Sequence, residues 1–99
     1  MAPVAIVTGA ADGIGWATAQ CLAQQGWRVA LLDLRAEAAL ARAAELGPGH
    51  LGLGCDVTDS NAVHTAVSAV LAQWGRIDGL VNNAGIGDQS VPTLQQTVD

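Results

Sequence analysis

The hydrophobic residues of the chain gather in four short runs, and longer stretches with a different spacing lie between them. The runs are rich in Val, Leu and Ile and mostly lack the alternation of apolar and polar positions that marks a half-exposed strand. Strands of a parallel sheet that is covered on both faces have this pattern. We therefore predict four parallel strands, at Val4–Val7, Val29–Leu32, Leu51–Cys55 and Ile77–Val81.

Between the runs, apolar residues recur every three or four positions, which predicts three helices. Gly26, Gly47 and Gly75 follow these stretches, where a helix commonly ends in a left-handed residue. Thr58 or Asp59 can cap the start of the third helix. The three apolar faces consist of Ile14, Ala17, Cys21 and Leu22; of Ala36, Ala39, Leu40 and Ala43; and of Val63, Val67, Val70, Leu71 and Trp74.

The alternation of strands and helices predicts a fold of the α/β class. With right-handed crossovers, a βαβαβαβ chain makes a Rossmann-type doubly wound parallel sheet, most simply with the strand order 3-2-1-4. The 99 residues are enough for one domain and too few for two. After Gly85 the pattern weakens into a loop that leads towards a helix, so we interpret residues 1–99 as the N-terminal portion of an incomplete domain.

The charge of the chain argues against nucleic acid and acidic membranes as partners. The net charge is −5, and the four basic residues, all Arg, are spread along the sequence. The start of the chain lacks the charged segment of a signal peptide and the long apolar run of a membrane span, which predicts a cytoplasmic location.

Cysteine and histidine give no sign of a metal site. Cys21 and Cys55 do not resemble a disulfide framework or a metal cluster, and we predict that both are reduced and buried. His50 and His64 have no carboxylate or cysteine at a convincing ligand spacing. Surface or helix-face positions are therefore favoured for them over metal ligation.

The stretch TGAADGIG, residues 8–15, connects the first predicted strand to the first helix and contains three glycines. Without Cβ atoms at Gly9, Gly13 and Gly15, the chain can turn tightly and a pyrophosphate can approach the backbone, where free amides and the helix dipole attract it. A tight turn without a ligand is the alternative for a glycine cluster taken alone. The spacing is T-G-x-x-x-G-x-G, not the commoner G-x-G-x-x-G.

An acidic residue, Asp33, ends the second predicted strand 18 residues after Gly15. At about this spacing a carboxylate receives a ribose 2′-hydroxyl in dinucleotide folds, and it would repel a 2′-phosphate, so NAD is favoured over NADP. Asp12 adds to that case, although a solvated residue favoured by the helix dipole is an equally good interpretation of it. Arg35 is a mild sign to the contrary.

Polar residues also follow the third and fourth predicted strands. Asp56 and Val57 can flank an adenine ring, although the same residues suit an ordinary strand exit and helix cap. The segment Asn82–Gly85 leaves the fourth strand, which neighbours the first in the order 3-2-1-4. We expect this segment to lie beside the glycine loop, with a simple turn as the alternative.

Taken together, the TGxxxGxG loop, Asp33, the Asp56-Val57 pair and the NNAG segment resemble the short-chain dehydrogenase/reductase family over essentially the whole chain. This resemblance implies an NAD-dependent oxidoreductase that exchanges a hydride between the nicotinamide and a small alcohol or ketone, with residues 1–99 as the N-terminal portion of its NAD-binding domain. The residues expected to bind the cofactor or to shape its site are Gly9, Asp12, Gly13, Ile14, Gly15, Asp33, Asp56, Val57, Asn83, Ala84 and Gly85.

The catalytic residues that the resemblance implies are a Tyr, a Lys four residues later and a Ser, and the chain has no Tyr and no Lys. A phenol needs a nearby cation before it can act as a base near neutrality. We therefore expect no catalytic residue here, and favour the cofactor-binding part of an enzyme completed by a missing C-terminal half or an oligomer partner. A stand-alone, non-catalytic dinucleotide-binding module is the alternative. Trp16, just inside the first helix, has no evident role in either.

Overall fold

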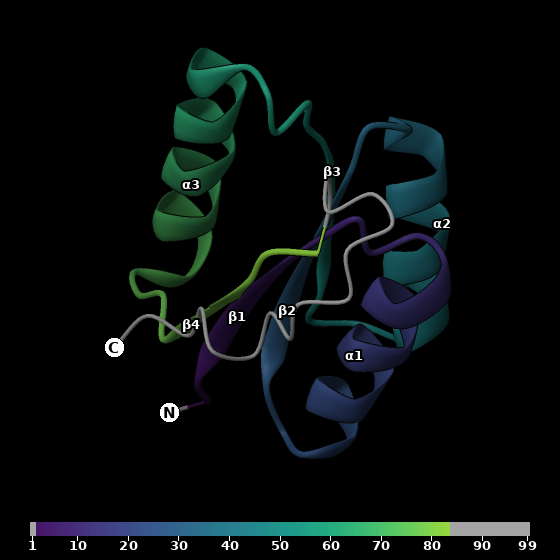
Figure 1. Ribbon diagram of the computed structural model, residues 1–99. Helices are drawn as coiled ribbons and strands as arrows, with labels where there is room; N and C mark the ends of the chain where they lie inside the picture. Colours follow the sequence, from purple (N-terminus) through teal and green to yellow (C-terminus); the bar gives the residue numbers. More distant parts are fainter. Residues whose placement is uncertain (1, 84–99) are drawn as a thin grey trace.

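The computed structural model describes residues 2–83, in which strands and helices alternate along the chain (Figure 1). The strand order β3-β2-β1-β4 confirms the predicted doubly wound topology. The predicted loop after Gly85 lies outside the described residues. The elements are β1 (Val4–Thr8), α1 (Gly13–Gln24), β2 (Arg28–Asp33), α2 (Ala36–Leu46), β3 (Leu51–Gly54), α3 (Ser60–Trp74) and β4 (Gly79–Val81).

The carboxyl ends of the strands meet at one edge of the sheet. All three strand pairs are parallel, with Thr8 opposite Leu32 in the pair of β1 and β2. Asp33, at the end of β2, is opposite Gly54, at the end of β3. The segments that leave β1, β2, β3 and β4 therefore start side by side, at the edge where ligands of open α/β sheets bind.

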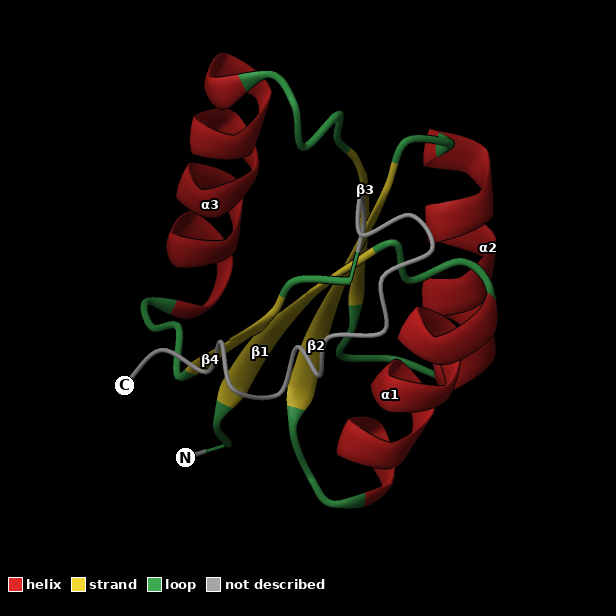
Figure 2. Ribbon diagram, in the orientation of Figure 1, coloured by secondary structure: helices red, strands yellow, loops and turns green. Residues whose placement is uncertain are grey.

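Helices α1 and α2 cover one face of the sheet, and small residues make the contact (Figure 2). Ala19, Ala39 and Ala43 are buried. A Cβ atom on Gly52 of β3 would lie only 2.3 Å from the carbonyl oxygen of Ala39, so the backbone of α2 rests directly on this strand. The core on this side consists of Val7, Ala10, Ala19, Val29, Leu31, Ala43 and Val81.

Helix α3 covers the opposite face with larger side chains. Val70 is fully buried, and Trp74 packs partly against the core. Asp59 caps the helix, as one of the two predicted candidates: its carboxylate accepts hydrogen bonds from the amides of Asn61 at 3.0 Å and Ala62 at 3.4 Å. The core on this side consists of Val4, Ile6, Ala30, Leu32, Cys55, Ala66 and Val70.

The face of α1 that packs on the sheet is not the apolar face found in the sequence. Ile14, Ala17 and Cys21 are exposed, whereas Gly15 and Ala19 are buried. The reason is steric, since residues without large side chains let the helix lie close to the strands. The prediction that Cys21 is buried was therefore wrong, whereas Cys55 is buried as predicted.

Within residues 2–83, no helix has the length and apolar character needed to cross a membrane. No group of three or more His, Cys, Asp or Glu side chains in the same residues could hold a metal ion.

Candidate functional site

The loop between β1 and α1 depends on glycine at three positions. Gly9 and Gly13 have φ angles of 60° and 59°, in the left-handed region that L side chains rarely adopt. Gly15 is required for another reason, because a Cβ atom there would lie 2.1 Å from the carbonyl oxygen of Gly9. It would also lie 2.9 Å from Nδ2 of Asn83, in the segment that leaves β4. The loop therefore folds back closely on the start of its own helix.

The backbone amides of this loop divide into two groups. Those of Ala10 and Ala11 are used internally: the first donates to the carbonyl of Leu32 at 3.1 Å and the second to Oδ2 of Asp33, also at 3.1 Å. The amides of Gly13, Ile14 and Gly15 have no acceptor within the described part of the chain. They lie in the first turn of α1, where the helix dipole favours negative charge. The loop thus offers a set of unused donors suited to a phosphate group.

Asp33 is buried at the end of β2 and points towards the glycine loop. Its Oδ2 accepts from the Ala11 amide, and its Oδ1 accepts from the amide of Arg35 at 3.1 Å and from Nε of Arg35 at 3.4 Å. Burial raises the pKa of Asp33, but these hydrogen bonds outweigh it and hold the pKa below its usual value. Because each carboxylate oxygen can accept two hydrogen bonds, Oδ2 keeps capacity for one further donor, such as a hydroxyl group.

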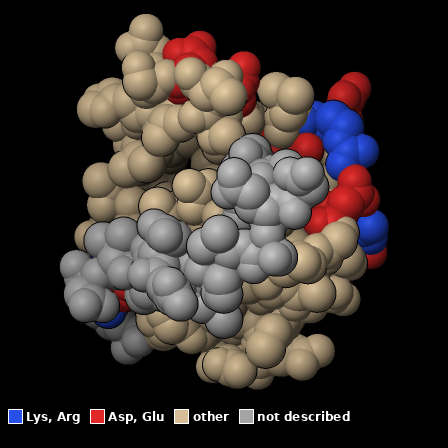
Figure 3. Space-filling model, viewed as in Figure 1, with Lys and Arg blue, Asp and Glu red and all other residues tan. Residues whose placement is uncertain are grey.

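Asp12 immediately precedes α1, yet its carboxylate makes no capping hydrogen bond to the helix. It forms an ion pair with Arg35 and lies 3.9 Å from a guanidinium nitrogen of Arg42. Figure 3 shows acidic and basic side chains gathered on the side of the molecule where α2 lies. The alternative interpretation of Asp12 as a solvated residue at the helix terminus therefore describes only part of its surroundings.

Two residues without a predicted role, Trp16 and Arg42, meet beside the same loop. The Arg42 guanidinium lies over the Trp16 ring, 4.6 Å from the ring centroid, and its Nε donates to the carbonyl of Ala11 at 2.9 Å. The stacking joins α1 to α2, and the hydrogen bond joins α2 to the loop. No sequence motif reveals this arrangement, because the two side chains come from different helices.

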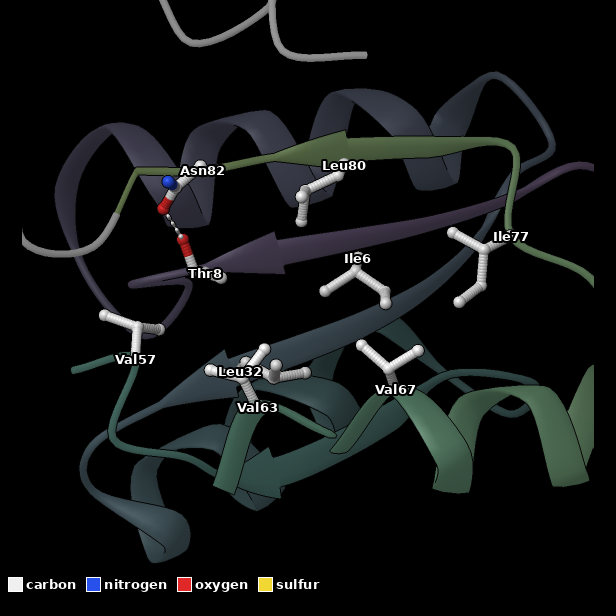
Figure 4. A pocket seen from close by; sticks show the side chains of 9 residues that line it. All are labelled: Ile6, Thr8, Leu32, Val57, Val63, Val67, Ile77, Leu80 and Asn82. Atoms are coloured by element: carbon white, nitrogen blue, oxygen red, sulfur yellow. Dashed lines mark hydrogen bonds between the residues drawn. The ribbon is translucent and has the colours of Figure 1, made fainter. Parts of the chain in front are cut away.

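The segment after β4 lies against the end of β1, as expected for neighbouring strands. The amide of Asn83 donates to Oγ1 of Thr8 at 2.8 Å, and the Thr8 hydroxyl lies 3.1 Å from Oδ1 of Asn82 (Figure 4). Because Asn83 also lies close enough to Gly15 to exclude a Cβ atom there, these contacts place two of the predicted motifs side by side. Ala84 and Gly85, the other members of that motif, lie outside the described residues.

A mostly apolar cavity of about 380 Å³ opens between the sheet and α3. Figure 4 shows side chains from β1, β2, β4 and α3 around it, with Thr8, Asn82 and Val57 towards the carboxyl ends of the strands. Its lining consists of Ile6, Thr8, Leu32, Val57, Val63, Val67, Ile77, Leu80 and Asn82.

Asp56 lies at the same edge but is exposed and makes a local turn. Its Oδ1 accepts from the amide of Thr58 at 3.0 Å and from the Thr58 hydroxyl at 2.6 Å, and these bonds lower the pKa of Asp56. The other carboxylate oxygen has no partner within residues 2–83. Val57 is half-buried and lines the cavity. The structure thus provides both a free acceptor and an apolar surface where the sequence suggests an adenine contact.

Comparison with known proteins agrees with this arrangement. A sequence model described as short chain dehydrogenase matches residues 3–99. The chain is 54% identical over 86 residues to D-threitol dehydrogenase of Mycolicibacterium smegmatis, covering 84% of this chain and 33% of that protein. It is 37% identical over 99 residues to 3-oxoacyl-[acyl-carrier-protein] reductase of Bos taurus, covering 100% of this chain and 42% of that protein. The chain thus spans about a third to two fifths of the length of these relatives.

A solved structure is also similar. The crystal structure of 3-ketoacyl-(acyl-carrier-protein) reductase from Brucella melitensis, complexed with NADH, has a TM-score of 0.82 and 39% sequence identity. The match covers 86% of this chain and 35% of that one.

Proposed function

The chain belongs to the short-chain dehydrogenase family, and from that premise we propose that it binds NAD(H) within an oxidoreductase acting on a small alcohol or ketone. Its relatives are named as dehydrogenases and reductases, which supports this class of reaction. When bound, the nicotinamide dinucleotide supplies or accepts the hydride. The residues of this chain bind and orient it.

The observation that carries the proposal is the pair of features at the carboxyl ends of β1 and β2. Unused amides of Gly13, Ile14 and Gly15 lie in the first turn of α1, where a pyrophosphate would find donors without any cationic side chain. One strand away, Asp33 is buried and ionised and keeps an acceptor position on Oδ2. A linked phosphate and ribose would use both features at once.

We further propose that the cofactor is NAD in preference to NADP. A carboxylate accepts hydrogen bonds from a ribose diol and repels a 2′-phosphate. The hydrogen bonds from Ala11 and Arg35 support this assignment, because they outweigh the effect of burial on the pKa of Asp33 and so keep this buried carboxylate charged. Asp56 and Val57 remain proposed contacts of the adenine, and Asn83, Ala84 and Gly85 remain proposed parts of the opposite wall.

Catalysis would need groups that the 99 residues do not contain, since the chain has neither Tyr nor Lys. We propose that residues 1–99 are the cofactor-binding portion and that the proton-transferring groups come from further protein. The same absence also suits a stand-alone dinucleotide-binding module. Hydride-transfer activity of the intact protein with simple alcohols and ketones would favour the enzyme, and NADH binding without any such activity would favour the module.

The proposal is tested by exchanging Asp33 for Ser and for Asn in the intact protein and titrating each variant with NADH and NADPH. We expect Asp33→Ser to weaken NADH binding by about tenfold to a hundredfold, as for a lost hydrogen bond to a charged group, and to narrow the gap to NADPH. Asp33→Asn keeps the side-chain shape and one acceptor, so it should weaken NADH binding less.

Glu37→Gln is the matched control, because it removes one exposed negative charge from the start of α2. It should leave the affinity for both cofactors as in the wild type. Equal binding of NADH and NADPH by the wild type would reject the role assigned to Asp33.

A further inference from the structure

We propose that Asp12 is a specificity-determining residue: it holds the Arg35 guanidinium away from a cofactor 2′-phosphate, so that the chain prefers NAD although an arginine lies beside the ribose position. This inference rests on the proposed function and extends it. It concerns a residue pair that joins the glycine loop to the start of α2.

Arg35 is well placed to meet a phosphate at the ribose. Its backbone amide donates to Oδ1 of Asp33 at 3.1 Å, and its Nε lies 3.4 Å from the same oxygen. The residue is therefore anchored to the carboxylate that would receive the 2′-hydroxyl. The guanidinium could bind a 2′-phosphate in a bidentate manner, as arginine commonly does with phosphate. The presence of Asp33 therefore does not by itself prevent the Arg35 guanidinium from binding the 2′-phosphate of NADP.

Asp12 pairs with the same guanidinium group of Arg35 through a different nitrogen from the one that faces Asp33. Its carboxylate is free of any capping role at α1 and pairs with a terminal nitrogen of Arg35. The hydrogen bond and the charge of Asp12, followed by those of Asp33, raise the pKa of Arg35. Both ends of the guanidinium group therefore already face carboxylates, and a phosphate would have to displace one of them.

Arg42 lies near the other oxygen of the Asp12 carboxylate. The Arg42 guanidinium is held by the carbonyl of Ala11 at 2.9 Å, by the Trp16 ring at 4.6 Å and by Glu45 at 3.2 Å. One of its nitrogens lies 3.9 Å from the carboxylate of Asp12. Asp12 therefore lies between two arginines, one anchored to α1 and the loop and the other to Asp33. This arrangement gives Trp16 a role as the platform beneath Arg42.

The charges around the ribose position indicate how the preference between NAD and NADP should change when Asp12 is neutralised. Two carboxylates, Asp12 and Asp33, pair with the Arg35 guanidinium, whereas Arg42 also pairs with Glu45. Neutralising Asp12 would free a terminal nitrogen of Arg35 and leave Asp33 alone paired with it, so the positive charge of Arg35 would be less balanced where the 2′-phosphate would lie. The pair is exposed, with 57% of the Arg35 side chain and 68% of the Asp12 side chain accessible, so the effect should be modest.

The test measures the ratio of the dissociation constants for NADPH and NADH on the intact protein, by titrating the cofactor fluorescence. Asp12→Asn keeps the shape of the side chain and removes its charge. We expect it to shift the ratio about fivefold in favour of NADPH. In the background of Arg35→Gln, the same change should shift the ratio less than about twofold, because no guanidinium remains to be released.

Glu37→Gln is the matched control, since it removes an exposed carboxylate from the start of α2 that pairs with neither Arg35 nor Arg42 within the described residues. It should leave the ratio unchanged. An equal shift from Asp12→Asn with and without Arg35 would overturn the inference, because the effect would then be simple loss of repulsion. A wild type that binds NADH, together with an unchanged ratio in Asp12→Asn, would also overturn it while leaving the proposed function intact. A wild type that binds neither cofactor would remove the proposed function, and this inference with it.

Discussion

The two faces of the sheet are packed in different ways. Towards α1 and α2 the closest contacts are made by alanine and glycine, and a Cβ atom on Gly52 or Gly54 would lie 2.3 Å or 2.7 Å from an atom of α2. Towards α3 the contact is made by branched aliphatic side chains, and a cavity of about 380 Å³ remains between the helix and the strands. One face thus allows the closest approach of backbones, whereas the other leaves a cavity whose lining Figure 4 shows.

The two kinds of packing suit the different parts of the candidate site that the two faces carry. The closely packed face carries the glycine loop, in which the Gly9 carbonyl lies close against Gly15 at the start of α1. Small residues define such positions because they leave little freedom for the helix to shift. The other face carries Val57, which lines the cavity and which we propose as a contact of the adenine ring.

The largest effect should come from adding a methyl group where the backbones touch. In Gly52→Ala the new Cβ would lie 2.3 Å from the Ala39 carbonyl oxygen and 2.7 Å from the Cα of Leu40, so α2 must move away from β3. We expect a loss of about 3 kcal/mol in the free energy of unfolding of the intact protein, measured with urea.

Gly26→Ala is the control, because a Cβ there meets nothing within 4 Å and only the φ of 93° is strained. We expect it to cost about 1 kcal/mol. Equal losses for the two variants would mean that the contact between α2 and β3 is looser than described.

Two substitutions, one on each face of the sheet, should show the difference in packing directly, with a smaller loss of stability. Ala39→Val enlarges a fully buried residue on the closely packed side and should cost about 2 kcal/mol, since it forces atoms together. Val67→Leu enlarges a residue that lines the cavity, and the added carbon has space to occupy. We expect the free energy of unfolding of this variant to remain within about 0.5 kcal/mol of the wild type. A similar loss in both variants would show that the cavity is filled in the intact protein.

The sequence predicted the strands and their order because continuous apolar runs have few other uses in a chain of this length. It failed at α1, where Ile14, Ala17 and Cys21 form an apolar stripe that the structure leaves exposed. Apolar spacing shows which residues share a side of a helix, but not which side packs. At α1 the choice depends on Gly15 and Ala19, whose small size allows contact with the sheet.

Part of the candidate site could likewise be predicted from the sequence, and part of it could not. The glycine loop and Asp33 could be predicted because their chemistry follows from residue type and spacing along one chain segment. The stacking of Arg42 on Trp16 and the pairing of Asp12 with Arg35 could not be predicted, because they join residues 23 or more positions apart whose partners are set only by the fold. Arg35 stood out in the sequence as a cation two residues after Asp33. The sequence did not show that the carboxylates of Asp12 and Asp33 both pair with it.

The closely packed side also contains a polar contact of His50. Its loss should change the free energy of unfolding less than the two kinds of substitution above. Nδ1 of His50 accepts a hydrogen bond from the amide of Val29 at 3.1 Å, just before the first pair of the ladder between β2 and β3, Ala30 opposite Leu51. Burial lowers the pKa of His50, and protonation of Nδ1 would also break this bond. Because the folded-state pKa lies below the unfolded value of 6.5, the unfolded state binds the proton first.

The stability that His50 provides should therefore be complete above pH 6.5 and be lost as the pH falls through the folded-state pKa. His50→Asn places an amide oxygen near the position of Nδ1, so it keeps the acceptor and removes the titration. We expect the difference in free energy of unfolding between wild type and variant to turn against the wild type as the pH is lowered from about 8 to 5. His64→Asn, which changes an exposed histidine on α3, is the matched control. If the two histidine variants follow the same pH dependence, His50 does not secure the start of β3, and the tight packing of this face must depend on its small residues alone.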